Sequence, residues 1–321
     1  MYKFEHNISI FVFILFLPFI LSSDGDRSPF YQNCVKSCSK ANCTLEGAFQ
    51  EDSAKVQDKW NRLLNWSCND ECRYQCMWRA VQAFQERGYQ VPKFHGKWPF
   101  KRILGVQEPA SAFASLLNLI THMYMYSKLQ EISVRSTPHV LFWHAFAVVC
   151  MNAWIWSIIF HTRDTAFTEF MDYACALSMV MSLFIAAVVR ILYRRKKLAA
   201  ILLFLTLAYY VEHARYLYSG RIDYDYNMRV NIFFGAAGSL LWLGWAWRAR
   251  RARRYAWRLA ASTLLSAAAL ALELLDFPPR RGCDAHALWH FSTAPLPLLF
   301  YRFVIDDVKY SMPSLSIKKS T

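Results

Sequence analysis

The apolar residues of this chain are gathered into long runs instead of alternating with polar ones as in a soluble protein. Seven runs follow the amino-terminal third, at 106–127, 140–161, 165–189, 198–217, 230–247, 257–275 and 285–305. Each run is about 20 residues long, enough for a helix to cross a hydrocarbon core of roughly 30 Å. The pattern predicts an all-α integral membrane protein, with a seven-transmembrane-helix bundle over residues 106–305.

The chain begins with "MYKFEHNISIFVFILFLPFILSSDGD", in which a weakly basic start precedes an apolar stretch and two serines, Ser22 and Ser23. The apolar stretch is about 14 residues long, which is short for a spanning helix and typical of a signal-peptide core. Residues 1–23 are therefore predicted to be a signal peptide. An uncleaved anchor is the alternative.

Residues 24–105 form a polar segment that contains six of the nine cysteines: Cys34, Cys38, Cys43, Cys68, Cys72 and Cys76. After a signal peptide, such a set predicts up to three disulfides in an oxidising lumen, although about 15 pairings are possible. A zinc module is the alternative, but C-x₃-C-x₄-C and C-x₃-C-x₃-C are poor zinc-finger spacings. Glycosylation sequons at Asn42 and Asn65 fit the same luminal placement.

The formal charge of +14 is informative mainly about the orientation of the chain in the membrane. Lys and Arg cluster in "RILYRRKK" and "RARRARRYAWR", between apolar segments, as in cytosolic loops of membrane proteins. With a luminal amino terminus and seven crossings, residues 306–321 form a cytosolic tail. In this tail Lys318 and Lys319 match a dilysine signal read by a retrieval coat, with chance basic residues as the alternative. The charge pattern contains no evident basic-aromatic module for nucleic acid.

Ionisable side chains occur inside several apolar segments, where a bilayer makes them costly unless they line a cavity or a site. The stretch "WIWSIIFHTRDTAFTEFMDY" contains Ser157, His161 and Asp172, and "DAHALWHF" contains His286 and His290. Ser157 precedes His161 by about one helical turn, and the two later histidines share a helix face. In the predicted topology all five side chains lie in the luminal leaflet.

Three imidazoles with a water form the open ligand set of a catalytic zinc site, where zinc lowers the pKa of water to about 7. In such a site Asp172 would act as general base, and Ser157 would donate to the oxyanion of an ester or amide. The residues thus predict a luminal-facing, metal-dependent lipid hydrolase. Taken singly, they also have structural interpretations: helix packing for Ser157, ion pairing for Asp172 and interface placement for the histidines. Glu169 and Glu273 are further candidates to line or support the pocket.

The S-x₃-H pair, the aspartate eleven residues later and the final H-x₃-H resemble the CREST superfamily of seven-helix membrane hydrolases. More specifically, the chain resembles the post-GPI-attachment to proteins factor three family, a family of GPI-remodelling phospholipases. The matching stretches are "CRYQCMW", "VPKFHGKWPFKR", "QEPASAFASLLN", "NAWIWSIIFHTRDTAFTEFMDYACA" and "LDFPP…DAHALWHFSTAP". They cover most of the chain after the predicted signal peptide. The loop "PPRRGCDAH" departs from the family pattern, which affects expected luminal contacts but not the metal site.

The resemblance implies an enzyme of the Golgi or endoplasmic reticulum membrane that removes the sn-2 acyl chain from GPI-anchored proteins. It assigns zinc to His161, His286 and His290, and the catalytic pair to Ser157 and Asp172. Two alternatives remain: a non-catalytic seven-helix receptor or GPI-binding chaperone, and a ceramidase-like amide hydrolase. The cysteine-rich segment argues against the amide hydrolase, because a small sphingolipid needs no such domain.

Overall fold

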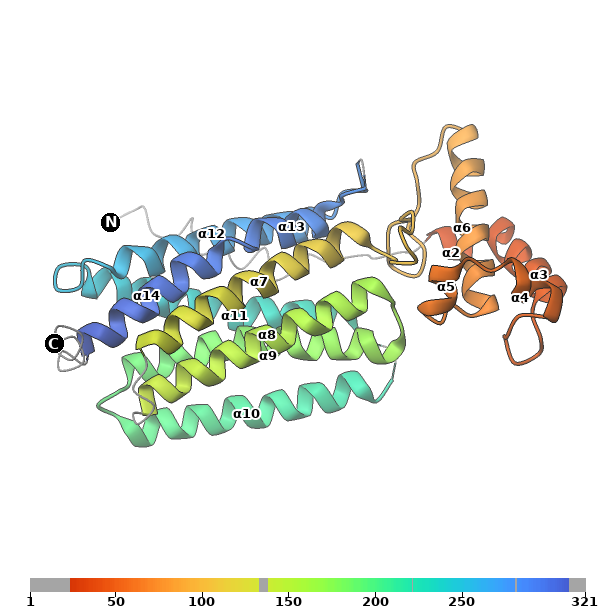
Figure 1. Cartoon of the computed structure of the whole chain (residues 1–321). Coiled ribbons are helices and arrows are strands. Elements are labelled where there is room, and N and C mark those ends of the chain that lie inside the picture. The colour runs from red at the N-terminus through yellow and green to blue at the C-terminus, as the bar shows by residue number, and fades with distance from the viewer. Residues whose placement is uncertain (1–23, 133–137, 221, 281, 312–321) are drawn as a thin grey trace. The chain divides into compact units, whose positions relative to one another are not determined.

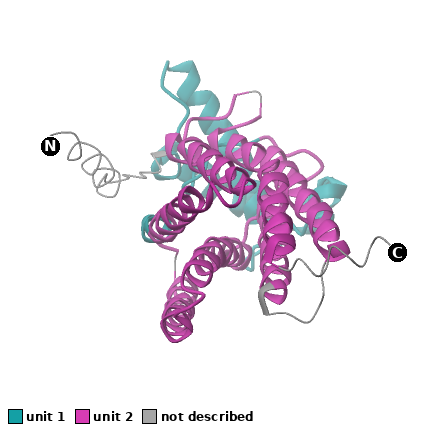
Figure 2. Ribbon diagram, turned by 90° about the vertical axis from the view of Figure 1, so that its left-hand side faces the viewer, with its two compact units in different colours: residues 1–100, 224–229 teal, residues 101–223, 230–321 magenta. Residues whose placement is uncertain are grey.

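The computed structural model describes residues 24–132, 138–220, 222–280 and 282–311 (Figure 1). Its elements there are helices, so the all-α prediction is confirmed. The chain divides into two compact units, Met1–Phe100 with Tyr224–Arg229 and Lys101–Asp223 with Val230–Thr321 (Figure 2). The predicted signal peptide, 1–23, and the Lys318 and Lys319 pair lie outside the described residues, and the predicted domain limits stay predictions.

The first unit contains short helices. They are α2 (Asp24–Arg27), α3 (Pro29–Asn42), α4 (Glu51–Val56), α5 (Lys59–Leu63) and α6 (Cys68–Glu86). Side-chain caps mark the starts of α3, α5 and α6. Ser28 caps α3 by accepting from the backbone of Tyr31, and Ser67 forms a capping box with Asp70 at the start of α6. The two longest helices, α3 and α6, pack against each other.

Three disulfides join α3 to α6. Two of them start within α3, and the third starts at Cys43, the C-cap residue of α3. They are Cys34–Cys76, Cys38–Cys72 and Cys43–Cys68, a nested and antiparallel set. Spacings of four or five residues place the cysteines along one face of each helix. The predicted disulfides are confirmed, and one pairing of the many is selected. The zinc-module alternative is wrong for these six residues, because a disulfide sulfur offers no thiolate to a metal.

The second unit is a bundle of helices, most of them long. They are α7 (Pro109–Ile132), α8 (Pro138–Thr162), α9 (Ala166–Ile191), α10 (Lys196–Tyr218), α11 (Tyr224–Ala249), α12 (Ala256–Leu275), α13 (Ala285–Thr293) and α14 (Leu296–Ser311). The unit contains α11 from Val230 onward. Helix α7 packs against α8 on one side and against α13 and α14 on the other (Figure 1). Aromatic side chains fill the centre of the bundle, including Trp143, Phe146, Tyr301 and Phe303.

Five described helices, α8 to α12, are long and apolar enough to cross a membrane by length and composition. Helix α7 is not among them, and its buried face carries polar residues such as Ser115 and Asn118. The seventh predicted segment is two helices, α13 and α14, with Pro295 between them and Pro297 in the first turn of α14. Proline lacks the amide hydrogen that a continuous helix needs, so the break follows from the sequence. The number of crossings stays a prediction.

Helix α14 continues through residues 306–311, which the sequence assigned to the tail, and buries an acidic residue there. Asp307 is only 1% exposed, and its Oδ1 accepts hydrogen bonds from Arg190, Arg253 and Tyr255 at 2.9, 2.6 and 2.8 Å. Arg190 belongs to α9, and Tyr255 is the N-cap residue of α12. One carboxylate therefore ties three parts of the bundle together at the end far from His161.

Replacing Asp307 by asparagine is expected to lower the free energy of unfolding by about 2 kcal/mol. Breaking a buried ion pair costs about 3–5 kcal/mol, and partial solvent access to both guanidiniums reduces that figure here. Thermal unfolding of the full-length protein in detergent measures the loss. Asp306→Asn is the matched control, because Asp306 and its partner Arg258 are both 31% exposed, and such a pair contributes less than about 1 kcal/mol. Equal losses in the two variants would contradict the prediction.

Candidate metal centre

The three predicted metal ligands come from the end of α8 and from α13. His161 lies in the last turn of α8, and His286 and His290 lie on α13. Helix α13 begins where the carboxylate of Asp284 accepts a hydrogen bond from the amide of Ala287 at 2.8 Å. That cap sets the start of the helix, and the four-residue spacing then places both histidines on one face.

The segment before α7 holds the end of α8 in place. The backbone amide of Glu108 donates to the carbonyl of His161 at 2.9 Å, and that of Gln107 donates to Thr162 at 3.1 Å. The last carbonyls of a helix have no partner within it, so these bonds satisfy groups that would otherwise be unpaired. The same contact places the Glu108 side chain beside the His161 ring.

The three imidazoles meet at their Nε2 atoms. The Nε2 of His286 is 3.4 Å from that of His161 and 2.9 Å from that of His290. A ligand nitrogen from each ring lies within 4.8 Å of the others. Nitrogens that bind one tetrahedral zinc ion at 2.0–2.1 Å are about 3.3 Å apart, so the spacing suits such an ion.

Two of the rings are held by carboxylates on their other nitrogen. His161 Nδ1 is 2.7 Å from Glu108 Oε2, and His286 Nδ1 is 2.6 Å from Glu273 Oε2. An ionised carboxylate only accepts, so each Nδ1 carries a proton, and in the neutral form of each ring Nε2 is then the unprotonated nitrogen. Two lone pairs then face each other across the centre of the cluster. A cation at that point satisfies both, and carboxylate-supported histidines are the usual surroundings of metal ligands.

The third ring is oriented by packing and by its backbone. His290 lies edge-on to Trp154, with ring centroids 5.4 Å apart, and its carbonyl accepts from Asn118 Nδ2 at 2.8 Å. His161 and His290 are 1% and 3% exposed, whereas the side chain of His286 is 33% exposed. A reactant therefore has access to the cluster from the side of His286.

The surroundings of Ser157 and Asp172 support their predicted roles less directly than the surroundings of the histidines support theirs. Ser157 is buried one turn before His161, and its Oγ lies 3.1 Å from that of Ser115. Because Ser115 donates to the carbonyl of Ser111 at 2.8 Å, Ser157 is the donor between the two serines. Its proton must turn away from Ser115 before it reaches a substrate. Asp172 is half-buried on α9, and its role as a base stays a prediction.

Sequence reasoning missed Glu108 and Asn118, and it named Glu273 only as a residue that might line the pocket. A signal for the first two was present, since both are polar residues in or next to an apolar segment, where burial demands a partner. Their partners lie 53 and 172 residues away, at His161 and His290. No local spacing relates residues so far apart.

Glu108→Gln is expected to weaken metal binding by about 10- to 100-fold, the usual cost of losing a carboxylate that supports a ligand histidine. The side-chain amide of the glutamine still accepts a hydrogen bond from His161, but it has no negative charge to attract the imidazole proton. Competition with a chromogenic chelator on the full-length protein measures the affinity. Glu212→Gln is the control, because Glu212 forms an exposed ion pair with Arg215 away from the histidines. Unchanged affinity in the Glu108 variant would exclude this supporting role.

These features define a class: helical integral membrane proteins with a candidate metal centre built from three histidines and two supporting carboxylates. Comparison with known families then gives a specific assignment. A model described as the Per1-like family matches residues 59–308, and the chain belongs to that family.

Its curated relatives extend over nearly the whole chain. A Drosophila melanogaster protein, "Post-GPI attachment to proteins factor 3", is 44% identical over 88% of this chain and 89% of its own length. Proteins called "GPI-specific phospholipase A2-like PGAP3" from Danio rerio and Homo sapiens are 43% and 40% identical. The first covers 92% of this chain and 95% of its own length, and the second covers 90% of each. No solved structure matches the chain.

Proposed function

We propose that this chain is a GPI-anchor remodelling enzyme, a metal-dependent hydrolase that removes the sn-2 acyl chain from the lipid of GPI-anchored proteins. The observation that carries the proposal is the histidine cluster, with Nε2 atoms 2.9 and 3.4 Å apart and two rings held by glutamates. The names of the relatives supply the substrate class. The placement of the cluster at helix ends agrees with an ester located just below lipid headgroups.

His161, His286 and His290 would hold the metal, and all-imidazole ligation favours zinc. Zinc supplies a Lewis acid that polarises an ester carbonyl and makes water more acidic at neutral pH. Glu108 and Glu273 keep the rings of His161 and His286 oriented and, by holding the proton at Nδ1, make Nε2 the nitrogen that each neutral ring offers to the metal.

The remaining polar residues would handle the proton and the developing charge. Asp172 takes a proton from the attacking water, whose oxygen bonds to the ester carbonyl carbon. Ser157 leaves Ser115 and donates to the carbonyl oxygen as negative charge develops there. The bond between that carbon and the glycerol oxygen then breaks, and the proton passes to the leaving alcohol. The products are a free fatty acid and a lyso form of the anchor.

The proposed setting is the Golgi or endoplasmic reticulum membrane, with the amino terminus in the lumen and the carboxyl terminus in the cytosol. The disulfides of the first unit support a luminal placement, because such bonds persist in oxidising compartments. The predicted signal peptide and glycosylation at Asn42 or Asn65 fit the same placement. Retrieval through a coat that reads Lys318 and Lys319 belongs to this proposal and rests on the sequence alone.

Reconstitution with three substrates tests the function against its alternatives. The full-length protein would be placed in vesicles with a GPI-anchored protein, an ordinary diacyl phospholipid or ceramide, and released fatty acid would be measured by mass spectrometry. Release from the GPI-anchored protein in preference to the other two is expected. Release from ceramide alone would favour the amide hydrolase. Binding of the anchor without release, in protein that retains its metal, would favour a receptor or chaperone.

A further inference from the structure

A groove lies between α8, α9 and α10, at the end of α8 opposite His161. It has a volume of about 560 Å³, and its apolar walls include Phe142, Trp143, Ala186, Val189, Ala199 and Leu203. Ligand-binding cavities in proteins commonly have volumes of about 300–1,000 Å³. The groove lies between helices that are able to span a membrane, so its contents come from the bilayer or from another membrane segment.

The polar residues of this groove are basic or neutral. Arg190, Tyr193 and Lys196 line it together with the apolar residues, and its lining contains no acidic side chain. Arg190 shares Asp307 with Arg253, so two guanidiniums surround one carboxylate and leave an excess of positive charge. The Nε of Arg190 is buried and has no hydrogen-bond partner in the described part of the chain. The groove therefore offers a net positive charge beside an apolar surface.

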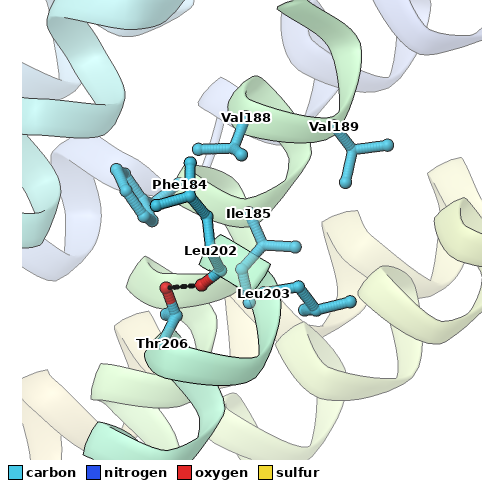
Figure 3. Close-up of a pocket in the computed structure, with 7 residues that line it drawn as sticks. All are labelled: Phe184, Ile185, Val188, Val189, Leu202, Leu203 and Thr206. Atoms are coloured by element: carbon cyan, nitrogen blue, oxygen red, sulfur yellow. Dashed lines mark hydrogen bonds between the residues drawn. The ribbon is translucent and has the colours of Figure 1, made fainter. Parts of the chain in front are cut away.

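The apolar side of the groove continues between α9 and α10. Figure 3 shows the adjoining crevice, which shares Val189 and Leu203 with the groove. Thr206 is the single polar side chain among the seven labelled residues, and its hydroxyl donates to the carbonyl of Leu202 at 2.8 Å. Because that hydroxyl is already satisfied, the walls here present only hydrocarbon. The crevice is too narrow to admit a ligand, so it closes the groove on this side with hydrocarbon, which favours an acyl chain over a polar group beside it.

We propose that this groove binds an anionic phospholipid, independently of the proposed hydrolase site. The lipid phosphate contacts Arg190, Lys196 and Tyr193, and one acyl chain lies along the walls formed by α8, α9 and α10. Charge complementarity selects this occupant, because the ammonium of a zwitterionic lipid offsets the charge of its own phosphate, and an apolar helix has no anion to pair with the basic side chains. In the predicted orientation the groove faces the cytosolic leaflet, which is the leaflet rich in anionic lipid.

Native mass spectrometry of the full-length protein with added phosphatidylserine or phosphatidylcholine of the same chain length tests this proposal. Phosphatidylserine is expected to bind more tightly. Lys196→Ala should weaken its binding about ten-fold, since the variant loses a charge-assisted hydrogen bond to the lipid phosphate that Lys197 does not make. Lys197→Ala is the matched control, because Lys197 is equally exposed on the same helix but does not line the groove. Its effect should stay within about two-fold, because an exposed charge that does not contact the lipid is screened by solvent and salt.

A second pair of variants tests the apolar part. Ala200→Phe adds a ring inside the groove and should reduce retention of the lipid, whereas Leu207→Phe changes an exposed position outside it. Equal effects of the two lysine variants would mean that general surface charge attracts the lipid, and the proposal would fail. Equal retention of phosphatidylserine and phosphatidylcholine would mean that the groove contacts bilayer lipids without selecting anionic ones, and it would contradict the proposal. A dimer that Ala200→Phe dissociates would assign the groove to a second copy of the chain.

Discussion

Replacing His286 by alanine is expected to reduce fatty-acid release from a GPI-anchored protein by about 10³-fold or more. Loss of a residue that only supports a metal ligand costs about 10- to 100-fold, and loss of a ligand itself should cost more. His286 also bridges the cluster, since its Nε2 lies within 3.4 Å of both other rings. Its removal leaves two imidazoles, one of them without a described partner at Nδ1.

The measurement pairs product formation with metal content. The variant, purified at full length, should release no detectable fatty acid and should contain less than one metal ion per chain. Leu288→Ala is the control, because Leu288 lies on the same helix but is 37% exposed and lies outside the cluster. A His286 variant that is folded, lacks metal and still releases fatty acid would refute the metal mechanism while leaving GPI remodelling intact.

Removing all three disulfides should prevent the first unit from folding, whereas removing one pair should only weaken it. The bonds are nested, so the loss of Cys34–Cys76 alone leaves Cys38–Cys72 to hold the same two helices together. The effective loop that Cys34–Cys76 closes is then about ten residues, which corresponds to about 2.5 kcal/mol of unfolding free energy. Without any of the bonds, the described part of the unit keeps a small apolar core around Tyr31, Ala80 and Phe94.

Protease resistance of the full-length protein in increasing denaturant reports on this unit. The Cys34→Ser, Cys76→Ser variant should lose resistance at a lower denaturant concentration than wild type, and the variant with six serines should be cleaved without denaturant. Cys283→Ser is the control, because Cys283 is a free cysteine. Resistance of the six-serine variant would show that packing alone is sufficient for folding.

Much of the fold could be predicted from the sequence because its signals are local. Runs of apolar residues indicated the helices, and five of them meet the length and composition expected of a membrane span. The break near Pro295 was overlooked, although proline is a strong local signal. The i, i+4 spacing of His286 and His290 placed both on one face without knowledge of any other helix.

The three-histidine cluster was also predictable, because the alternating direction of spanning helices brings the end of one apolar run level with the start of another. His161 ends α8 and His286 begins α13, so a topology with alternating crossings places them at the same depth. That reasoning predicts the depth of each histidine in the membrane, but it does not predict which helices are in contact with each other. It brought the right histidines together without showing which groups support them.

Most of the helices, the cysteine-rich segment and the three histidines could be located from the sequence, because each follows from spacing or from hydrophobic length along the chain. Tertiary structure alone decided the disulfide pairing, the Glu108–His161 and Glu273–His286 pairs and the burial of Asp307. The reason is physical. Helix periodicity relates residues within a few turns, whereas contacts between helices depend on how whole faces pack. Asn118 contacts the carbonyl of His290 only because α7 and α13 lie side by side.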